Sequence, residues 1–340
     1  MGQLSRYHVS APNSFALLRY LFAFCIFCNH ACIASGNDIF LCESSVFVWG
    51  FFVISGLLTF NSYIKTPDLK SFVAKRIRRI LPAYLAVVLM GFIAGMFLTS
   101  LPFSEFLHNA QTWKYLGANA VFLNYLQPTL PGVFEGNVLP FVNASLWTMK
   151  VEIMFYVSVP IVYWLINRYG RNKVIISIIL LSILYDVLTA ELYNCTGNPV
   201  YAKLNHQVFG MFAYFYAPVL LLFNKEKIRK HIVSLLVLSI PLLLFAYSNE
   251  WVKRLSPFTL SIVLVAFAYG VRKLHFSYGW KDVSYEFYLL HFPVLQVFLA
   301  INPGISLPVL LVMSLTFTLV LAMALNKVLA IWISWKSVVF

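Results

Sequence analysis

Arg19 and His30 are the first pair of residues whose types and spacing could support chemistry. They are eleven residues apart in one apolar segment. On an α-helix this spacing returns to within roughly 20° of the same face and separates the two side chains by about 16 Å along the axis. An imidazole with a pKa near neutrality can take a proton from a hydroxyl group. Alternatively, Arg19 reaches to the membrane surface and His30 is a hydrogen-bonded structural residue.

Glu152 places a carboxylate in a second apolar segment, about 10 Å beyond Ser145 if the segment is helical. An ionisable group at that depth needs a partner, a proton or water, so it is a functional candidate. Lys150 could be the partner, although side chains so close in sequence point in different directions on a helix.

Two other apolar segments carry polar groups whose simplest interpretation is structural. Residues 282–293 contain Tyr285 and His291, and His291 alone is better explained as a structural histidine. The pair Ser55-Gly56 favours close helix packing. A Ser55 nucleophile is the alternative, but no base stands beside it in sequence.

An arginine cluster, Arg76, Arg78 and Arg79, comes directly before a further apolar segment. The guanidinium group presents several donors in a fork that suits phosphate, so the cluster could hold a phosphorylated cosubstrate. The alternative is that it anchors the chain at the cytoplasmic membrane surface.

Composition indicates which elements must position these residues. The 340-residue chain is 61% hydrophobic and 11% charged, whereas a soluble domain would have roughly 25% charged residues. We therefore expect one membrane domain over residues 1–340 with no appended soluble domain.

The net charge of +13 would suggest nucleic acid as a partner of a soluble protein, but basic loops between apolar segments explain the charge here. The first apolar segment lacks a convincing cleavage site, so no cleavable signal peptide is expected.

The segment lengths predict an all-α fold, a polytopic transmembrane helical bundle with about ten spans. A shorter apolar segment near 113–126 is predicted to be re-entrant or interfacial. Loop charges place both termini in the cytoplasm, and the one exception is an outer loop with Lys253 and Arg254, partly offset by Glu250. The predicted spans are residues 14–34, 46–64, 81–101, 145–166, 174–192, 205–223, 232–247, 255–271, 283–300 and 307–327.

Five segments, in this order and spacing, resemble the acyltransferase family 3 membrane enzymes. Arg19 and His30 are similar to the Arg-x10-His signature of that family. The other four are Phe51-Phe-Val-Ile-Ser-Gly56, the basic segment from Arg76 to Pro82, the block Ser145-Leu-Trp-Thr with Glu152 and Phe155-Tyr156, and Ser284-Tyr285 with Tyr288-Leu-Leu-His291-Phe-Pro293.

The resemblance implies transfer of an acyl group, usually acetyl from acetyl-CoA, to a sugar hydroxyl of a cell-surface glycan such as O-antigen lipopolysaccharide or exopolysaccharide. It implies a bacterial inner-membrane enzyme that meets acyl-CoA on the cytoplasmic side, a glycan or lipid-linked sugar as acceptor, and membrane lipid, but no nucleic acid. No metal and no permanently bound cofactor are expected. Direct transfer and an acyl-enzyme both remain open. The alternative is a transporter or flippase of lipid-linked sugars, which would also line a polar path with ionisable residues.

The expected roles follow from combining the resemblance with the chemistry above. His30 is the expected general base, and Glu152 orients its ring or stabilises the imidazolium. The expected donor-binding residues are Arg19, Arg76, Arg78 and Arg79. The expected supporting residues are Ser55, Gly56, Trp147, Tyr156, Tyr285 and His291.

Overall fold

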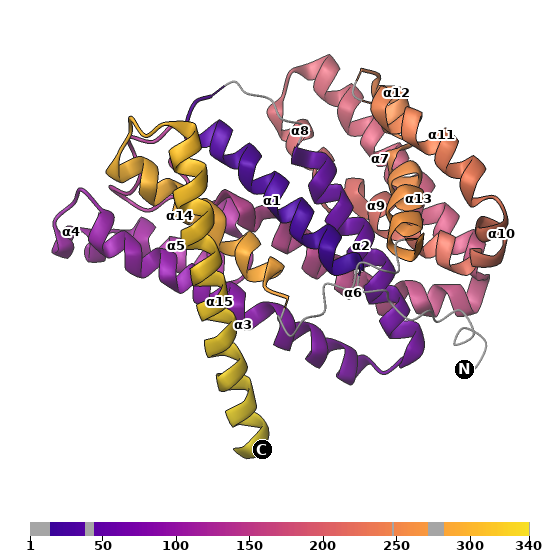
Figure 1. Cartoon of the computed structure of the whole chain (residues 1–340), viewed down its shortest axis with the longest axis horizontal. Helices are drawn as coiled ribbons and strands as arrows, with labels where there is room; N and C mark the ends of the chain where they lie inside the picture. Colours follow the sequence, from indigo (N-terminus) through magenta and orange to yellow (C-terminus); the bar gives the residue numbers. More distant parts are fainter. Residues whose placement is uncertain (1–13, 38–43, 247, 271–281, 340) are drawn as a thin grey trace. The chain divides into compact units, whose positions relative to one another are not determined.

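Helices make up the regular structure of the part of the chain described by the computed structural model, which covers residues 14–37, 44–246, 248–270 and 282–339. Figure 1 shows them in chain order, and these residues contain no strand. The helices are α1 (Ser14–Ala34), α2 (Ser44–Lys65), α3 (Leu69–Leu98), α4 (Phe103–His108), α5 (Ala110–Ala120), η2 (Asn124–Leu126), η3 (Ala144–Leu146), α6 (Trp147–Tyr169), α7 (Arg171–Thr196), α8 (Pro199–Asn205), α9 (Val208–Phe223), α10 (Lys225–Lys230), α11 (Ile232–Phe245), α12 (Glu250–Lys253), α13 (Ser256–Gly270), α14 (Ser284–Ile301) and α15 (Leu307–Val339).

The chain divides into two compact units, each built from three stretches of sequence. The first unit comprises Met1–Phe22, Ser45–Phe72 and Val151–Gly279. The second unit comprises Ala23–Ser44, Val73–Lys150 and Trp280–Phe340. Helix α1 therefore contributes Arg19 to the first unit and His30 to the second.

In the first unit, α9 packs against both α7 and α13, and α13 also packs against α11. Aromatic rings fill the interior: Phe155 of α6 stacks on Phe215 of α9 with ring centroids 4.4 Å apart. At the end of α7, Gly197 adopts the left-handed conformation with φ 65°, which glycine reaches without strain. Asn198 then caps α8 by accepting a hydrogen bond from the Val200 N–H. This tight corner brings α8 back alongside α7.

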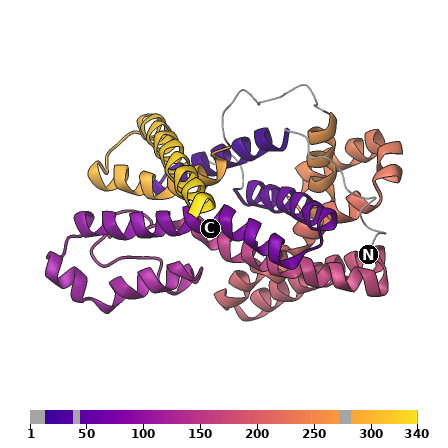
Figure 2. The same ribbon diagram turned by 90° about the horizontal axis from the view of Figure 1, so that it is seen from below.

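In the second unit, α5 lies beside α3, and α15 packs along α14 (Figure 2). A cluster of buried apolar residues joins α3, α4 and α5 to the irregular segment that follows them. Its members are Phe92, Phe106, Tyr115, Leu130, Val133, Phe134 and Val142.

The irregular segment, residues 121–143, is tied to α14 by side chains. Gln296 donates to the carbonyls of Leu139 and Phe141. Asn137 donates in return to the Gln296 carbonyl at 3.0 Å, and Asn143 donates to the Leu289 carbonyl at 2.8 Å. The Gln296 side chain thereby satisfies backbone carbonyls that no helix or strand pairs.

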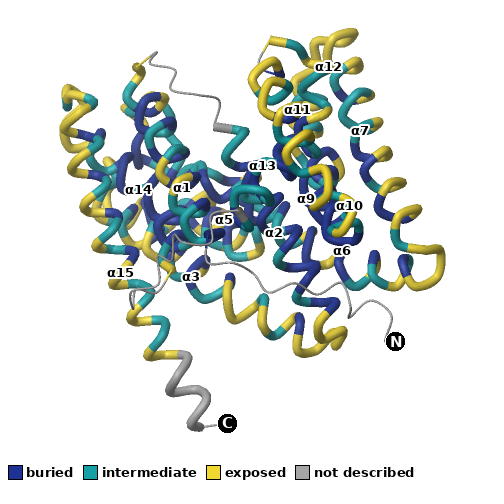
Figure 3. The backbone as a smooth tube through the Cα atoms, turned by 45° about the vertical axis from the view of Figure 1, so that its right-hand side comes forward, coloured by how far each residue is buried: buried dark blue, intermediate teal, exposed yellow. Residues whose placement is uncertain are grey.

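The outward surfaces of several helices are apolar, as expected for helices that face lipid. Figure 3 shows α7, α11 and α15 with many exposed positions. Those positions carry large apolar side chains, among them Leu181 of α7, Val233 of α11 and Val312 of α15, each more than 60% exposed. Such surfaces would be unfavourable in water, so we conclude that this is an integral membrane protein.

The predicted count of ten spans is confirmed only in part. Eight helices of the described chain are long and apolar enough to cross a bilayer. The other two predicted spans correspond to shorter apolar helices, Ile232–Phe245 and Ser256–Tyr269. Fourteen residues of α11 reach about 21 Å, less than the hydrocarbon core of about 30 Å. The predicted ends of these spans, residues 247 and 271, lie outside the described residues.

Two boundaries differ from the prediction in ways that bear on the site. Helix α3 begins at Leu69, twelve residues before the predicted span, so the arginine cluster is helical. The segment predicted to be re-entrant or interfacial, near 113–126, consists of the end of α5 and the single turn η2. It contains no helix of spanning length.

Candidate functional site

His30 and His291 form the centre of the candidate site in the second unit. Nδ1 of His30 on α1 lies 2.8 Å from Nε2 of His291 on α14, which is hydrogen-bonding distance. The two ring planes are nearly parallel, inclined by 14°, and their centroids are 5.1 Å apart. His291 is fully buried, whereas His30 is half-buried. The pair therefore has one fully buried member and one partly exposed member.

Aromatic side chains fix the orientation of both rings. Phe292 meets the His30 ring edge-on, with centroids 5.4 Å apart and planes at 89°. Phe287 stacks on His291 from the preceding turn of α14 at 6.1 Å, and Phe27 of α1 approaches His291 edge-on at 6.3 Å. Packed rings of this kind restrict rotation of the imidazoles.

A buried polar network supports His291 from the start of α6. The Ser145 hydroxyl lies 3.3 Å from Nε2 of His291. The Tyr288 hydroxyl donates to the Ser145 carbonyl at 3.2 Å and lies 2.9 Å from the hydroxyl of Thr148. Asn143 caps this turn by accepting from the Ser145 N–H at 3.0 Å.

Sequence reasoning assigned no role to these network residues. Ser145, Thr148 and Tyr288 all fall inside the two segments that resemble family motifs, which is the signal that could have singled them out. Asn143 lies just before the first of those segments, and nothing in its local pattern distinguishes it from an ordinary loop residue.

Ser55 and Glu152 meet in the first unit. The Ser55 hydroxyl on α2 donates to Oε1 of Glu152 on α6 at 2.5 Å. Both side chains are half-buried. Tyr156, one turn further along α6, is buried. The carboxylate predicted from sequence as a functional candidate thus has a hydroxyl partner from α2, while the Lys150 ammonium lies over the Tyr125 ring at 4.5 Å.

Gly56 has a packing role that the sequence predicted as its simpler interpretation. A Cβ atom at this position would come within 1.9 Å of the Phe215 carbonyl oxygen on α9. Only glycine permits so close an approach of the α2 and α9 backbones.

The arginine cluster lies on the first half of α3. Arg78 and Arg79 are exposed, and Arg76 is half-buried. The Tyr285 hydroxyl at the start of α14 donates to the Ile80 carbonyl at 3.2 Å. The beginning of α14 is therefore held against the arginine-bearing turns of α3.

The remaining predicted site residues are placed as follows. Arg19 is half-buried on the part of α1 that belongs to the first unit. Trp147 is half-buried at the first position of α6, in the second unit. His30 and Glu152 belong to different units, so the structure brings His30 together with His291, and Glu152 together with Ser55. The predicted action of Glu152 on His30 stays a prediction.

The histidine pair has a specific chemical capacity. Two neutral imidazole nitrogens in contact share one proton, so one ring donates and the other accepts. If His30 donates from Nδ1, its Nε2 carries a free lone pair and can act as a base. His291, with Ser145 beside it, then fixes the tautomer of His30.

Comparison with known proteins adds an independent finding. A family model described as an acyltransferase domain matches residues 13–330. Nodulation protein 10 from Rhizobium leguminosarum bv. viciae is 29% identical over 229 residues, which is 63% of this chain. The match covers 61% of that relative, less than two thirds of its length. No solved structure matches the chain.

Proposed function

Since the chain belongs to acyltransferase family 3, with the family domain covering residues 13–330, we propose that it moves an acyl group from acyl-CoA to a hydroxyl of a cell-surface glycan. The acyl group is acetyl, and the acceptor belongs to a lipopolysaccharide or an exopolysaccharide. The protein is a membrane acyltransferase, and the identity of donor and acceptor is the proposal.

The contact between His30 and His291 carries this proposal. Nε2 of His30 removes the proton from the acceptor hydroxyl as its oxygen attacks the thioester carbonyl carbon. A carbon–oxygen bond forms, the carbon–sulfur bond breaks, and the proton passes from His30 to the departing sulfur of CoA. One half-buried imidazole thus serves first as base and then as acid.

His291 acts as a positioning residue. The 2.8 Å contact from Nδ1 of His30 to Nε2 of His291 keeps the His30 proton on Nδ1, so that Nε2 faces the acceptor unprotonated. The Ser145 hydroxyl lies 3.3 Å from the same Nε2 and helps to hold the His291 ring in place. Glu152 stabilises the charge that develops on His30 in the transition state, as the sequence suggested.

The donor site is assigned to Arg19, Arg76, Arg78 and Arg79. Coenzyme A carries several phosphate charges, and arginine binds phosphate through two parallel hydrogen bonds. The exposure of Arg78 and Arg79 leaves their guanidinium groups accessible to such a ligand.

The proposed location is the bacterial inner membrane with both termini in the cytoplasm. The basic turns that support this orientation are the one with Arg168, Arg171 and Lys173 and the one at α10, with Lys227 and Arg229. Acyl-CoA is then on the same side as the arginine cluster.

The decisive experiment uses the purified protein in lipid nanodiscs with acetyl-CoA and surface glycan. Release of free CoA thiol, together with a gain of one acetyl mass on the glycan, is the expected result. A transporter of lipid-linked sugars would release no thiol and leave the glycan mass unchanged. That outcome would contradict the proposal.

A further inference from the structure

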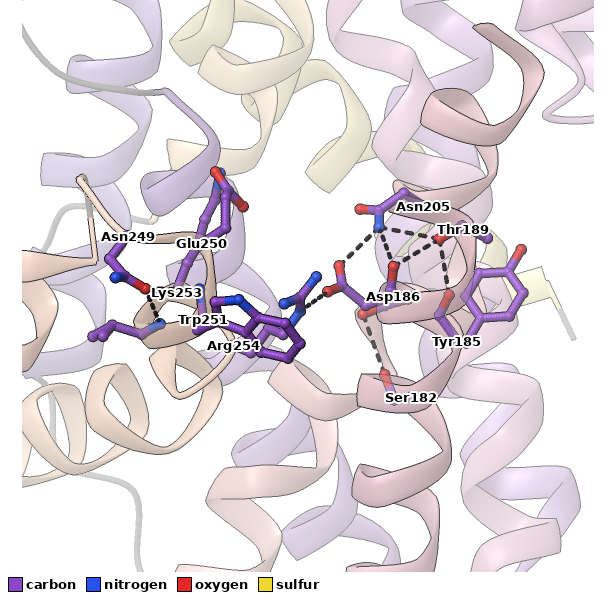
Figure 4. Close-up of polar contacts among 12 residues, drawn as sticks. Ser182, Tyr185, Asp186, Thr189, Asn205, Asn249, Glu250, Trp251, Lys253 and Arg254 are labelled. Carbon is purple, nitrogen blue, oxygen red and sulfur yellow. Dashed lines mark hydrogen bonds and ion pairs between the residues drawn. The ribbon is translucent and has the colours of Figure 1, made fainter. Parts of the chain in front are cut away.

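A second polar site lies within the first unit, away from the residues discussed so far. Helices α7, α8, α9 and α12 surround a pocket of about 220 Å³. Figure 4 shows Arg254, directly after α12, and Asn205 of α8 both reaching Asp186 of α7. Six of the residues that line it are Trp49, Asp186, Tyr193, Asn205, Tyr214 and Arg254.

Asp186 is the organising residue of this pocket. It lies within a predicted span, on α7, where a carboxylate needs a specific reason to be present. Its Oδ2 accepts from Nε of Arg254 at 3.0 Å, and its Oδ1 accepts from the Asn205 amide at 2.8 Å. Asn205 also donates to the Thr189 hydroxyl at 3.2 Å.

The pocket includes Lys253 and Arg254, the two basic residues whose predicted outer location is an exception to the positive-inside rule. Arg254 pairs with Asp186, and Lys253 pairs with Glu250 at 3.3 Å. Two acidic and two basic residues of the pocket therefore balance each other. A balanced pocket does not favour a strongly charged ligand such as a nucleotide, but it offers many donors and acceptors to a neutral polar one.

Arg254 retains donors that a ligand could use. Its Nε is engaged by Asp186, and its guanidinium lies over the Trp251 ring at 4.3 Å. Its two terminal amino groups have no hydrogen-bond partner within the described part of the chain, and the side chain is 13% exposed.

Aromatic residues supply the rest of the lining. Trp49 and Tyr214 stack with centroids 4.8 Å apart and planes inclined by 19°. Tyr193 at the rim is 43% exposed. Aromatic rings beside planar polar side chains suit a sugar ring, whose C–H face is apolar and whose edge carries hydroxyl groups.

We propose that this pocket is a binding subsite for a neutral sugar unit of the acceptor glycan. The proposal rests on the proposed function, because it assigns a place to the acceptor of that reaction. The volume lies below the usual range of about 300–1,000 Å³ for small-molecule sites, which fits one sugar ring rather than an oligosaccharide. The basic turn with Arg168, Arg171 and Lys173 favours a cytoplasmic location for the opposite end of α7. In the proposed topology this end of α7 and α12 is therefore on the outer side of the membrane, where a surface glycan is found.

The first test measures sugar binding without acyl-CoA. Saturation-transfer NMR on the full chain in nanodiscs would use glucose, galactose, rhamnose and N-acetylglucosamine as probes. At least one sugar should bind, and Tyr193→Ala and Glu250→Gln should each weaken that binding about tenfold, the effect of losing one good polar or stacking contact. Tyr193 is 43% exposed and the Glu250 side chain is 77% exposed, so these variants should fold normally.

Matched controls separate binding from a purely structural role. Tyr169→Ala and Glu226→Gln change an exposed tyrosine and an exposed carboxylate of the same unit outside the pocket, and they should bind sugar as the wild type does. No binding of any probe, or equal binding by pocket and control variants, would overturn the proposal.

A second measurement distinguishes failure of the subsite from failure of the proposed function. In the acylation assay, the two pocket variants should raise the KM for glycan about tenfold and leave kcat and the KM for acyl-CoA unchanged. Normal KM values in variants of an active enzyme would reject the subsite alone. Sugar binding that depends on the pocket in a protein that never transfers an acyl group would reject the proposed function alone.

Discussion

His30 and His291 are in hydrogen-bonding contact, with Nδ1 of the first 2.8 Å from Nε2 of the second, although 261 residues separate them in sequence. The contact gives His30 a partner that can hold its proton on one nitrogen and leave the other free. It also places His291 beside His30; its local pattern alone favoured a structural residue, and the family resemblance implied a supporting one. The predictions below test these roles.

His30→Ala should abolish detectable glycan acylation. A base that removes a hydroxyl proton contributes about 10²–10⁴-fold to the rate, and alanine has no replacement for it. Expression, membrane insertion and CoA binding should be largely retained, since His30 is on α1 and the arginine cluster is on α3. Mass spectrometry of the glycan measures the loss of acylation, and calorimetry measures the retained CoA binding. Near-normal acylation would reject the base assignment and make His291 the leading candidate.

Under the proposed mechanism, Glu152→Gln should slow turnover to a similar extent, because it removes the negative charge proposed to stabilise the imidazolium. The double variant with His30→Ala should be little worse than either single change, since residues that act as a unit are non-additive. Ser55→Ala, which removes the 2.5 Å hydrogen bond to Glu152, should give a smaller loss. Multiplicative effects of the two single changes would show that Glu152 acts independently of His30.

His291→Phe should lower kcat while keeping an aromatic ring of similar size in the buried site. Without Nε2 as acceptor, His30 has no group that fixes its tautomer, so the share of rings with a free Nε2 falls. ¹⁵N NMR of labelled histidine should show His30 protonated on Nδ1 in the wild type and a mixture of tautomers in the variant. A purely structural role would lower stability and leave the tautomer unchanged.

Arg79→Ala should weaken CoA binding by about 1.5–3 kcal/mol, the usual value of a hydrogen bond to a charged group. The KM for acyl-CoA should rise by a corresponding factor of roughly 10–150. Arg168→Ala, an exposed arginine in another basic turn, is the matched control and should bind CoA normally. If Arg79→Ala inserts correctly and keeps wild-type affinity, the residue is a membrane anchor and not part of the donor site.

Gly56→Ala should destabilise the protein by about 1–3 kcal/mol, as overpacking usually does, because the added Cβ would overlap the Phe215 carbonyl. Gly117→Ala is the control: it lies in α5 with no atom within 4 Å of an added Cβ, so it should be neutral or stabilising by about 0.5–1 kcal/mol. Thermal unfolding in detergent measures the stability change of each variant. Equal melting temperatures would show that α2 and α9 are not in contact at this position.

Local patterns in the sequence located several elements of the fold. The first predicted span, residues 14–34, coincides with α1, because an uninterrupted apolar run of bilayer length has few other solutions. The span count was less certain, since α11 and α13 are apolar but short. Hydropathy cannot decide whether such helices cross the membrane completely.

The pairing of site residues was harder to predict from sequence. The Ser55–Glu152 and His30–His291 contacts join residues 97 and 261 positions apart, and no local periodicity carries that information. Asp186 was missed for a related reason. It lies in a mostly apolar run outside the family-like motifs, and its partners Arg254 and Asn205 approach it only in the folded chain.

The hydrogen bonds from Gln296 to the irregular segment impose an order on biosynthesis. The segment's carbonyls at Leu139 and Phe141 are 157 and 155 residues upstream of the amide that satisfies them. At about 5–20 residues per second, the ribosome needs roughly 8–30 s to make that intervening stretch. Until α14 emerges, the segment must keep these carbonyls in contact with water or the translocation machinery. The irregular segment can therefore reach its final hydrogen bonding only after α14 has been made. The His30–His291 contact also forms only then, because His291 is on α14.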